Sequence, residues 1–137
     1  MTGREMLQFD WEEVEGEAIS SVVGHFENSP EGAGVRLWSI AFVLTSGAVI
    51  LSVDNDSDEI TVRREPSVAG GGQPWLEVEA LSGLIGRKLG WCWIGRSYRG
   101  YLDTFTLALD GVDPSFMFVA EASALQCHAT PRIDALR

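Results

Sequence analysis

Alternating apolar and polar positions dominate the chain and predict a series of short β-strands. Residues 35–44 carry apolar side chains in both registers, which predicts a central strand with two buried faces. Residues 60–65 alternate more strictly, which is typical of a half-exposed strand toward a sheet edge. Strand-forming residues also fill further segments, which cover residues 18–27, 48–53, 88–95, 100–110, 115–120 and 124–129.

Turn-forming residues separate these strands at short intervals, which indicates hairpins. Residues 45–47, Thr-Ser-Gly, predict a tight turn, and residues 28–34 predict a loop. Three consecutive glycines within residues 66–74 predict a flexible connector. Residues 75–85 instead place apolar side chains three to four positions apart, with acidic residues in the early turns, which predicts a short helix.

These segments predict one domain of the α+β class, mainly antiparallel β. We expect a single curved sheet or a small open barrel, with one short helix at about residues 75–85. No linker or repeat divides the chain, so we expect a single domain over residues 1–137. Residues 1–16 are acidic and contain aromatic side chains, which predicts an irregular or helical lead-in that packs on the core.

An acidic stretch between two predicted strands has two interpretations. Its carboxylates match positions one, three, five and twelve of a calcium loop, and they are Asp54, Asp56, Asp58 and Glu65. However, Glu59 occupies the position at which such a loop requires glycine, and strands replace the two flanking helices. We therefore favour a polar turn of a β-hairpin, with residues 48–65 forming the hairpin and no metal bound.

Charge and composition limit the classes of partner. The 137 residues carry a formal net charge of -10, which argues against nucleic acid and suits a basic protein partner. No apolar run reaches the roughly 18 residues of a membrane-spanning helix. The first residues do not resemble a signal peptide, so we expect a cytoplasmic protein without a membrane partner.

Few residues suggest catalysis. Cys92 and Cys127 are predicted to be free thiols, and no Cys-x-x-Cys spacing indicates a metal. Neighbouring strand residues point to opposite faces, so Cys127 and His128 are not placed as a nucleophile and its base. Phosphate-loop, dinucleotide and zinc-protease motifs are absent from the sequence, so we expect no cofactor. For the same reason we favour a protein that is not an enzyme.

The aromatic stretch of residues 90–105 is the richest candidate for ligand binding. Its candidate residues are Trp91, Trp93, Arg96, Arg99, Tyr101 and Asp103. In one interpretation Asp103 anchors a ligand in an aromatic groove. In the other, Asp103 is a partly buried structural carboxylate that accepts hydrogen bonds from Arg96, Arg99 or backbone N–H groups.

The segment "IGRKLGWCWIGRSYRGYLDTFTLAL" resembles small, uncharacterised bacterial domains. In these, a Trp-containing strand is followed by a Gly-Tyr-x-Asp hairpin, and "DNDSDEI" adds to the likeness. The resemblance covers roughly residues 16–128 and implies no known activity, so no functional residue is transferred.

Two functions remain open from the sequence. The first is a non-catalytic protein-interaction module, with immunity-type inhibition as one form. Its surface would present the acidic hairpin and the N-terminal carboxylates, which are Asp10, Glu12, Glu13, Glu15 and Glu17. The second is a small-ligand binder or enzyme with a pocket around Trp91, Trp93, Tyr101 and Asp103.

Overall fold

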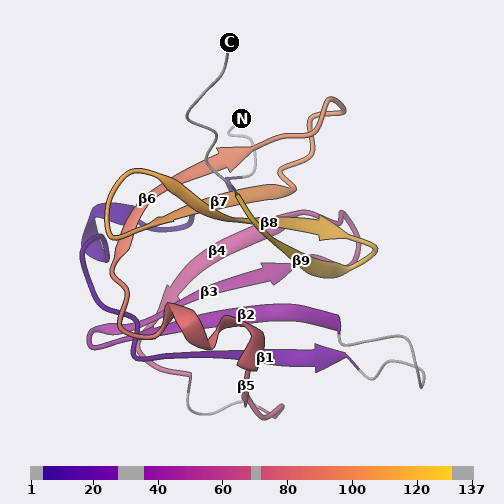
Figure 1. Ribbon diagram of the computed structural model, residues 1–137. Coiled ribbons are helices and arrows are strands. Elements are labelled where there is room, and N and C mark those ends of the chain that lie inside the picture. Colours follow the sequence, from indigo (N-terminus) through magenta and orange to yellow (C-terminus); the bar gives the residue numbers. More distant parts are fainter. Residues whose placement is uncertain (1–4, 28–35, 69–71, 131–137) are drawn as a thin grey trace.

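The computed structural model describes residues 5–27, 36–68 and 72–130 (Figure 1). Within these residues nine strands join into one antiparallel sheet. The strands are β1 (Ser21–Glu27), β2 (Arg36–Leu44), β3 (Gly47–Val53), β4 (Ile60–Glu65), β5 (Leu76–Glu77), β6 (Leu89–Gly95), β7 (Thr104–Leu109), β8 (Pro114–Glu121) and β9 (Ala124–Ala129). Two 3-10 helices, η1 (Trp11–Glu13) and η2 (Glu79–Leu84), accompany them.

The predicted curved antiparallel sheet is confirmed. Its strand order is β4-β3-β2-β9-β8-β7-β6, while β1 pairs with β2 and β5 pairs with β1. β2 is central, as predicted, because it pairs with β1, β3 and, through Leu37 opposite Leu125, with β9. The sheet curls so that β1 to β4 and β6 to β9 face each other in Figure 1.

The main core lies between these two halves of the sheet. Phe42 from β2 meets Phe118 from β8 edge-to-face, with 6.0 Å between ring centroids, and both side chains are fully buried. Phe105 from β7 is equally buried beside them. Full burial of one such side chain contributes about 1.5–3 kcal/mol, so these aromatics hold the halves together.

The N-terminal segment connects the two ends of the sheet. The Val62 N–H of β4 donates to the carbonyl of Met6 at 2.8 Å. Further along, the Gly16 N–H donates to the carbonyl of Leu89 in β6 at 2.7 Å. Met6 and Trp11 are buried between these two attachments, so the segment covers the open side of the core with apolar side chains.

The helix predicted for residues 75–85 needs correction, because this segment contains β5 and the 3-10 helix η2 and no α-helix. Glu77 pairs with Val23 of β1, so the segment begins extended. Val78 follows as a helix cap without a side-chain hydrogen bond. Gly86, at φ +89°, lies just beyond the helix, and the few residues left between strand and glycine favour a short 3-10 turn.

Both predicted hairpins around β3 are confirmed. Leu44 pairs with Gly47, which leaves a two-residue turn, and Val53 pairs with Ile60 across the acidic loop. The loop predicted over residues 28–34, and residues 69–71 of the predicted connector, lie outside the described residues. In the part of the chain that is described, no helix is long and apolar enough to cross a membrane.

Candidate functional site

A second apolar cluster lies on the outer face of the sheet, away from the main core. Ala41, Ala48 and Ile50 form it on β2 and β3. Val68 and Trp75 pack over them from the two described ends of the connector that follows β4. This part of the outer face is therefore covered by Val68 and Trp75, and Trp75 also contacts His25 near the end of β1.

His25 is stacked between two tryptophans. Its ring centroid lies 3.7 Å from that of Trp75 and 4.6 Å from that of Trp38, with interplanar angles of 29° and 21°. His25 pairs with Ser39 whereas Phe26 pairs with Leu37, so Trp38 is the extra residue of a β-bulge in β2. Such bulges redirect a side chain, and here the bulge coincides with the stacking of Trp38 on His25.

Both ring nitrogens of His25 are buried without a hydrogen-bond partner among the residues that the structure describes. The residue is 9% exposed. A buried polar group without a partner costs about 1–3 kcal/mol, and native proteins contain few of them. Because the nitrogens are shielded from bulk water, a hydrogen-bonding group that enters the site would relieve this cost.

A chain of polar side chains runs across the sheet beside this stack. The Ser39 and Ser52 hydroxyl oxygens lie 3.0 Å apart, and the Arg63 Nη1 donates to the Ser52 Oγ at 3.1 Å. Glu65 lies 3.8 Å from the Arg63 Nε. Ser39 is fully buried, so the chain leads from the interior of the sheet to a half-buried guanidinium.

These groups surround an open cleft of about 350 Å³. The cleft, called the His25 cleft below, is lined by His25, Trp38, Ile50, Arg63, Glu65 and Trp75, together with Ser67, Val68, Gly72 and Gln73. Its walls combine aromatic and aliphatic side chains with the polar side chains of His25, Arg63 and Glu65. That combination, at the small end of the usual volume range, is typical of sites for small organic molecules.

The charge state of His25 follows from its surroundings. Burial lowers the pKa of its imidazole, and the positive charge of Arg63 lowers it further. The nearby backbone of Gln73 opposes this shift without forming a hydrogen bond of normal geometry with the ring. The neutral imidazole, with one donor and one acceptor nitrogen, is therefore favoured near pH 7.

The cleft lacks the contacts of a nucleophilic site among the described residues. The Ser39 hydroxyl bonds to Ser52, and neither nitrogen of His25 accepts a hydrogen bond from it. Both cysteines are free thiols, and they lie on β6 and β9 rather than beside His25. Burial raises the pKa of the half-buried Cys92 thiol to about 11, and Glu15 adds to this shift. Cys127 is exposed, and no neighbouring group in the described part of the chain lowers the pKa of its thiol, so neither thiol is activated.

The aromatic residues singled out from the sequence lie around β6 but do not line one common hollow. Trp91 and Trp93 are 53% and 36% exposed, with ring centroids 6.3 Å apart. Trp91 lines a hollow beside Lys88 and Asp110, whereas Arg96 lines another beside Ile94 and Leu102. Tyr101 is half exposed and, like Asp103, precedes β7, which begins at Thr104.

Asp103 does not meet the arginines that were expected to bind it. Its carboxylate accepts a hydrogen bond from the Thr104 hydroxyl at 3.3 Å. Arg96 donates to the carbonyl of Gly100 at 2.7 Å, and Arg99 donates to the Tyr98 hydroxyl at 2.9 Å. The ligand-binding role of this residue set stays a prediction without a common cleft to support it.

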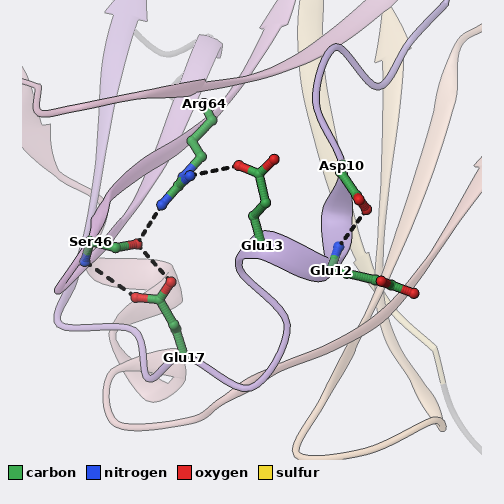
Figure 2. A network of polar contacts seen from close by, with 6 residues as sticks. All are labelled: Asp10, Glu12, Glu13, Glu17, Ser46 and Arg64. Carbon is green, nitrogen blue, oxygen red and sulfur yellow. Dashed lines mark hydrogen bonds and ion pairs between the residues drawn. The ribbon is translucent and has the colours of Figure 1, made fainter.

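Several N-terminal carboxylates are engaged within the molecule, as Figure 2 shows. Glu13 pairs with Arg64 at 2.7 Å, and Glu17 accepts a hydrogen bond from the Ser46 hydroxyl at 2.6 Å. Asp10 caps η1 by accepting from the backbone N–H of Glu12 at 3.1 Å. Glu13 and Glu17 hold the N-terminal segment against β4 and the β2–β3 turn. Glu12 and Glu15 are exposed, as are Asp10 and Glu13.

The four carboxylates of the calcium alternative do not converge. Asp54 accepts from the backbone N–H of Asp56 at 2.9 Å, which closes a turn in the loop. Asp58 accepts from backbone N–H groups of the β8–β9 turn, and Glu65 pairs with Ala48 at the opposite end of the hairpin. In the described part of the chain, no group of three or more His, Cys, Asp or Glu side chains is placed to hold a metal ion.

Reasoning from the sequence missed the His25 cleft, because its residues come from distant segments. His25 lies on β1, Trp38 on β2, Arg63 on β4 and Trp75 just before β5. A weak signal was present in β1, where Ser21, Val23 and His25 share one register and place a titratable ring on the same face as an apolar side chain. The bulge that accommodates Trp38 leaves no recognisable mark in the sequence.

Comparison with known proteins identifies the family and no function. No curated protein and no solved structure matches the chain. One family model, described as "Family of unknown function (DUF6334)", matches residues 1–134. The match covers nearly the whole chain and confirms the expected likeness to an uncharacterised domain. The chain therefore belongs to this family of unknown function.

Proposed function

We propose that this protein is a non-catalytic binding protein that holds a small organic molecule in the His25 cleft. The observation that carries the proposal is the buried imidazole of His25, whose two nitrogens have no partner among the described residues. A group with this cost to stability is retained at a functional site more readily than in a purely structural core.

The surroundings of His25 suit binding better than catalysis. Trp38 and Trp75 cover the two ring faces and leave the imidazole little freedom to reorient. A general base is normally oriented by a hydrogen bond to a carboxylate or carbonyl, and in the described residues neither nitrogen of His25 makes such a bond of normal geometry, although the Gln73 backbone lies nearby. The imidazole can instead serve as a fixed hydrogen-bonding group beside apolar walls.

Tryptophan side chains provide the test, because the indole N–H signals report on separate surfaces. We would screen ¹⁵N-labelled protein against a library of small organic fragments at millimolar concentration by NMR. Binders should shift the indole signals of Trp38 and Trp75, which line the cleft, and leave those of Trp91 and Trp93 in place. Trp75→Ala should raise the Kd of such binders at least about tenfold, since one wall is lost.

Trp93→Ala is the matched control, because it also removes a partly exposed indole but on β6. It should leave the same Kd unchanged. The proposal fails if no fragment shifts the Trp38 or Trp75 signal, or if the binders shift only Trp91 and Trp93. The second outcome would make the aromatic stretch around β6 the favoured ligand-binding site.

Protein interaction is a second candidate, and a particular row of side chains favours it. Trp93, Thr106, Met117 and His128 lie opposite one another on adjacent strands β6 to β9, so they share one face of the sheet. The row contains no Asp, Glu, Lys or Arg, in a chain of net charge -10. An uncharged row with Trp and Met suits an apolar protein surface better than the basic partner expected from composition.

A further inference from the structure

Resting on the proposed function, we infer that the His25 cleft selects a small monocarboxylate. In this arrangement the carboxylate pairs with Arg63, and the apolar body of the molecule packs against the indoles of Trp38 and Trp75. The assignment rests on the geometry of Arg63, on its neighbours and on the charge that surrounds it.

Arg63 is held in place, but not all of its hydrogen-bond donors have a partner. Its Nη1 donates to the Ser52 hydroxyl, which is itself fixed by the buried Ser39. Its Nε lies 3.8 Å from Glu65, which is too long for a hydrogen bond. Within the described residues its Nη2 has no hydrogen-bond partner, so an edge of the guanidinium remains available beside the cleft.

Arg64, the next residue on β4, gives a useful contrast. Its guanidinium donates to Glu13 at 2.7 Å and to the Ser46 hydroxyl at 3.0 Å (Figure 2). Adjacent residues of a strand point to opposite faces, so Arg64 lies on the other side of the sheet from Arg63. One arginine therefore serves the fold, whereas its neighbour presents a free donor edge at a cleft.

The surrounding charge limits how much negative charge the bound molecule can carry. A guanidinium binds a carboxylate through parallel hydrogen bonds, which are stronger than neutral ones. Glu65 lies close to Arg63, and the chain as a whole carries a net charge of -10, so a dianion such as phosphate is repelled. The neutral His25 adds one donor and one acceptor but no further charge.

Matched probes test this inference. At pH 8, where inorganic phosphate is mostly the dianion, we would titrate the ¹⁵N-labelled protein with phenylacetate, with neutral phenylacetamide and with inorganic phosphate, and follow the Trp75 indole signal. Phenylacetate should bind with a Kd at least about tenfold lower than phenylacetamide, as expected for one charge-assisted hydrogen bond. Phosphate should not shift the Trp75 signal.

Two variants locate the effect. Arg63→Gln should raise the Kd of phenylacetate to that of phenylacetamide, because only the charged contact is lost. Arg64→Gln is the control, since it removes the same charge from the opposite face and should preserve the tenfold difference. Circular dichroism at the titration temperature shows that each variant is folded.

The alternative outcomes separate this inference from the proposed function. Equal Kd values for phenylacetate and phenylacetamide, or a Trp75 response to neutral fragments but not to phenylacetate, overturn the carboxylate assignment and leave a binding cleft. Competition by phosphate overturns the selection for a monoanion. A Trp75 signal that responds to no compound, including the fragment library, overturns the proposed function as well.

Discussion

Trp11→Ala should lower the free energy of unfolding by about 3–5 kcal/mol, the usual cost of removing a large buried aromatic side chain. Trp11 is 8% exposed, and its ring meets that of Phe105 edge-to-face at 5.8 Å. Its indole Nε1 donates to the carbonyl of Gly90 at 2.8 Å. The substitution therefore removes core packing and a buried hydrogen bond, and it loosens the segment that joins β4 to β6.

The position on β6 that accepts the hydrogen bond from Trp11 requires glycine. A Cβ on Gly90 would lie 2.0 Å from the carbonyl oxygen of Gly111, so only glycine fits this close approach of two backbone segments. Trp91→Ala is the control, because that indole is 53% exposed and only one residue away from Gly90. It should cost less than about 1 kcal/mol.

Urea unfolding followed by circular dichroism measures both variants without relying on tryptophan fluorescence. Equal losses for Trp11→Ala and Trp91→Ala would show that the N-terminal segment contributes nothing special to the core. A loss confined to Trp11→Ala supports its role in closing the open side of the sheet.

Asp58→Ala should lower the free energy of unfolding by about 1–3 kcal/mol, because backbone donors lose a charged acceptor and because alanine disfavours the positive φ of 58° at this position. The Asp58 carboxylate accepts from the N–H groups of Ala122 and Ser123 at 3.1 and 2.9 Å. Both turn residues have positive φ, at 52° and 64°, which neither alanine nor serine favours. The acidic hairpin therefore stabilises an unfavourable turn between β8 and β9.

Asp56→Ala provides the control within the same loop. The backbone N–H of Asp56 donates a hydrogen bond to the Asp54 carboxylate, and alanine at position 56 preserves that bond. The variant should change the unfolding free energy by less than about 0.5 kcal/mol. Urea unfolding of both variants decides the matter, and an equal effect at the two positions would mean that the carboxylate of Asp58 does not support the β8–β9 turn.

Much of the sheet could be predicted from the sequence, because alternation and turn residues act locally. The pattern of β2, the Thr-Ser-Gly turn and the acidic hairpin each depend on a few neighbouring residues, and each matches the observed pairing. The short strand β5 carried no such pattern. Its two residues form a strand only because β1 offers an edge for pairing.

The candidate site was less accessible to prediction, for two physical reasons. The strand predicted over residues 100–110 begins four residues too early, because β7 begins at Thr104, so Asp103 lies just before the strand. The stack at His25 depends on a bulge in β2 and on Trp75, which packs on the outer face from a distant segment. Neither feature has a local signature, since both arise from how distant segments meet.

His25 also makes the stability of the protein depend on pH. Burial lowers the pKa of its imidazole in the folded state, whereas the unfolded chain has the ordinary value of about 6.5. The unfolded state therefore binds the proton more readily, and stability present above about pH 6.5 is lost as the pH falls below that value. Besides His25 itself, the charged groups that line the cleft are Arg63 and Glu65.

The free energy of unfolding of His25→Phe at pH 7.5, compared with that of the natural sequence, tests the central claim most directly. Phenylalanine can occupy the space between Trp38 and Trp75 without leaving a buried nitrogen unpaired, so we expect an equal or higher free energy of unfolding. The advantage of the variant should grow at pH 5.5, because it cannot be protonated. A loss of more than about 1 kcal/mol at pH 7.5 would contradict the account, since the imidazole would then serve the fold rather than a bound molecule.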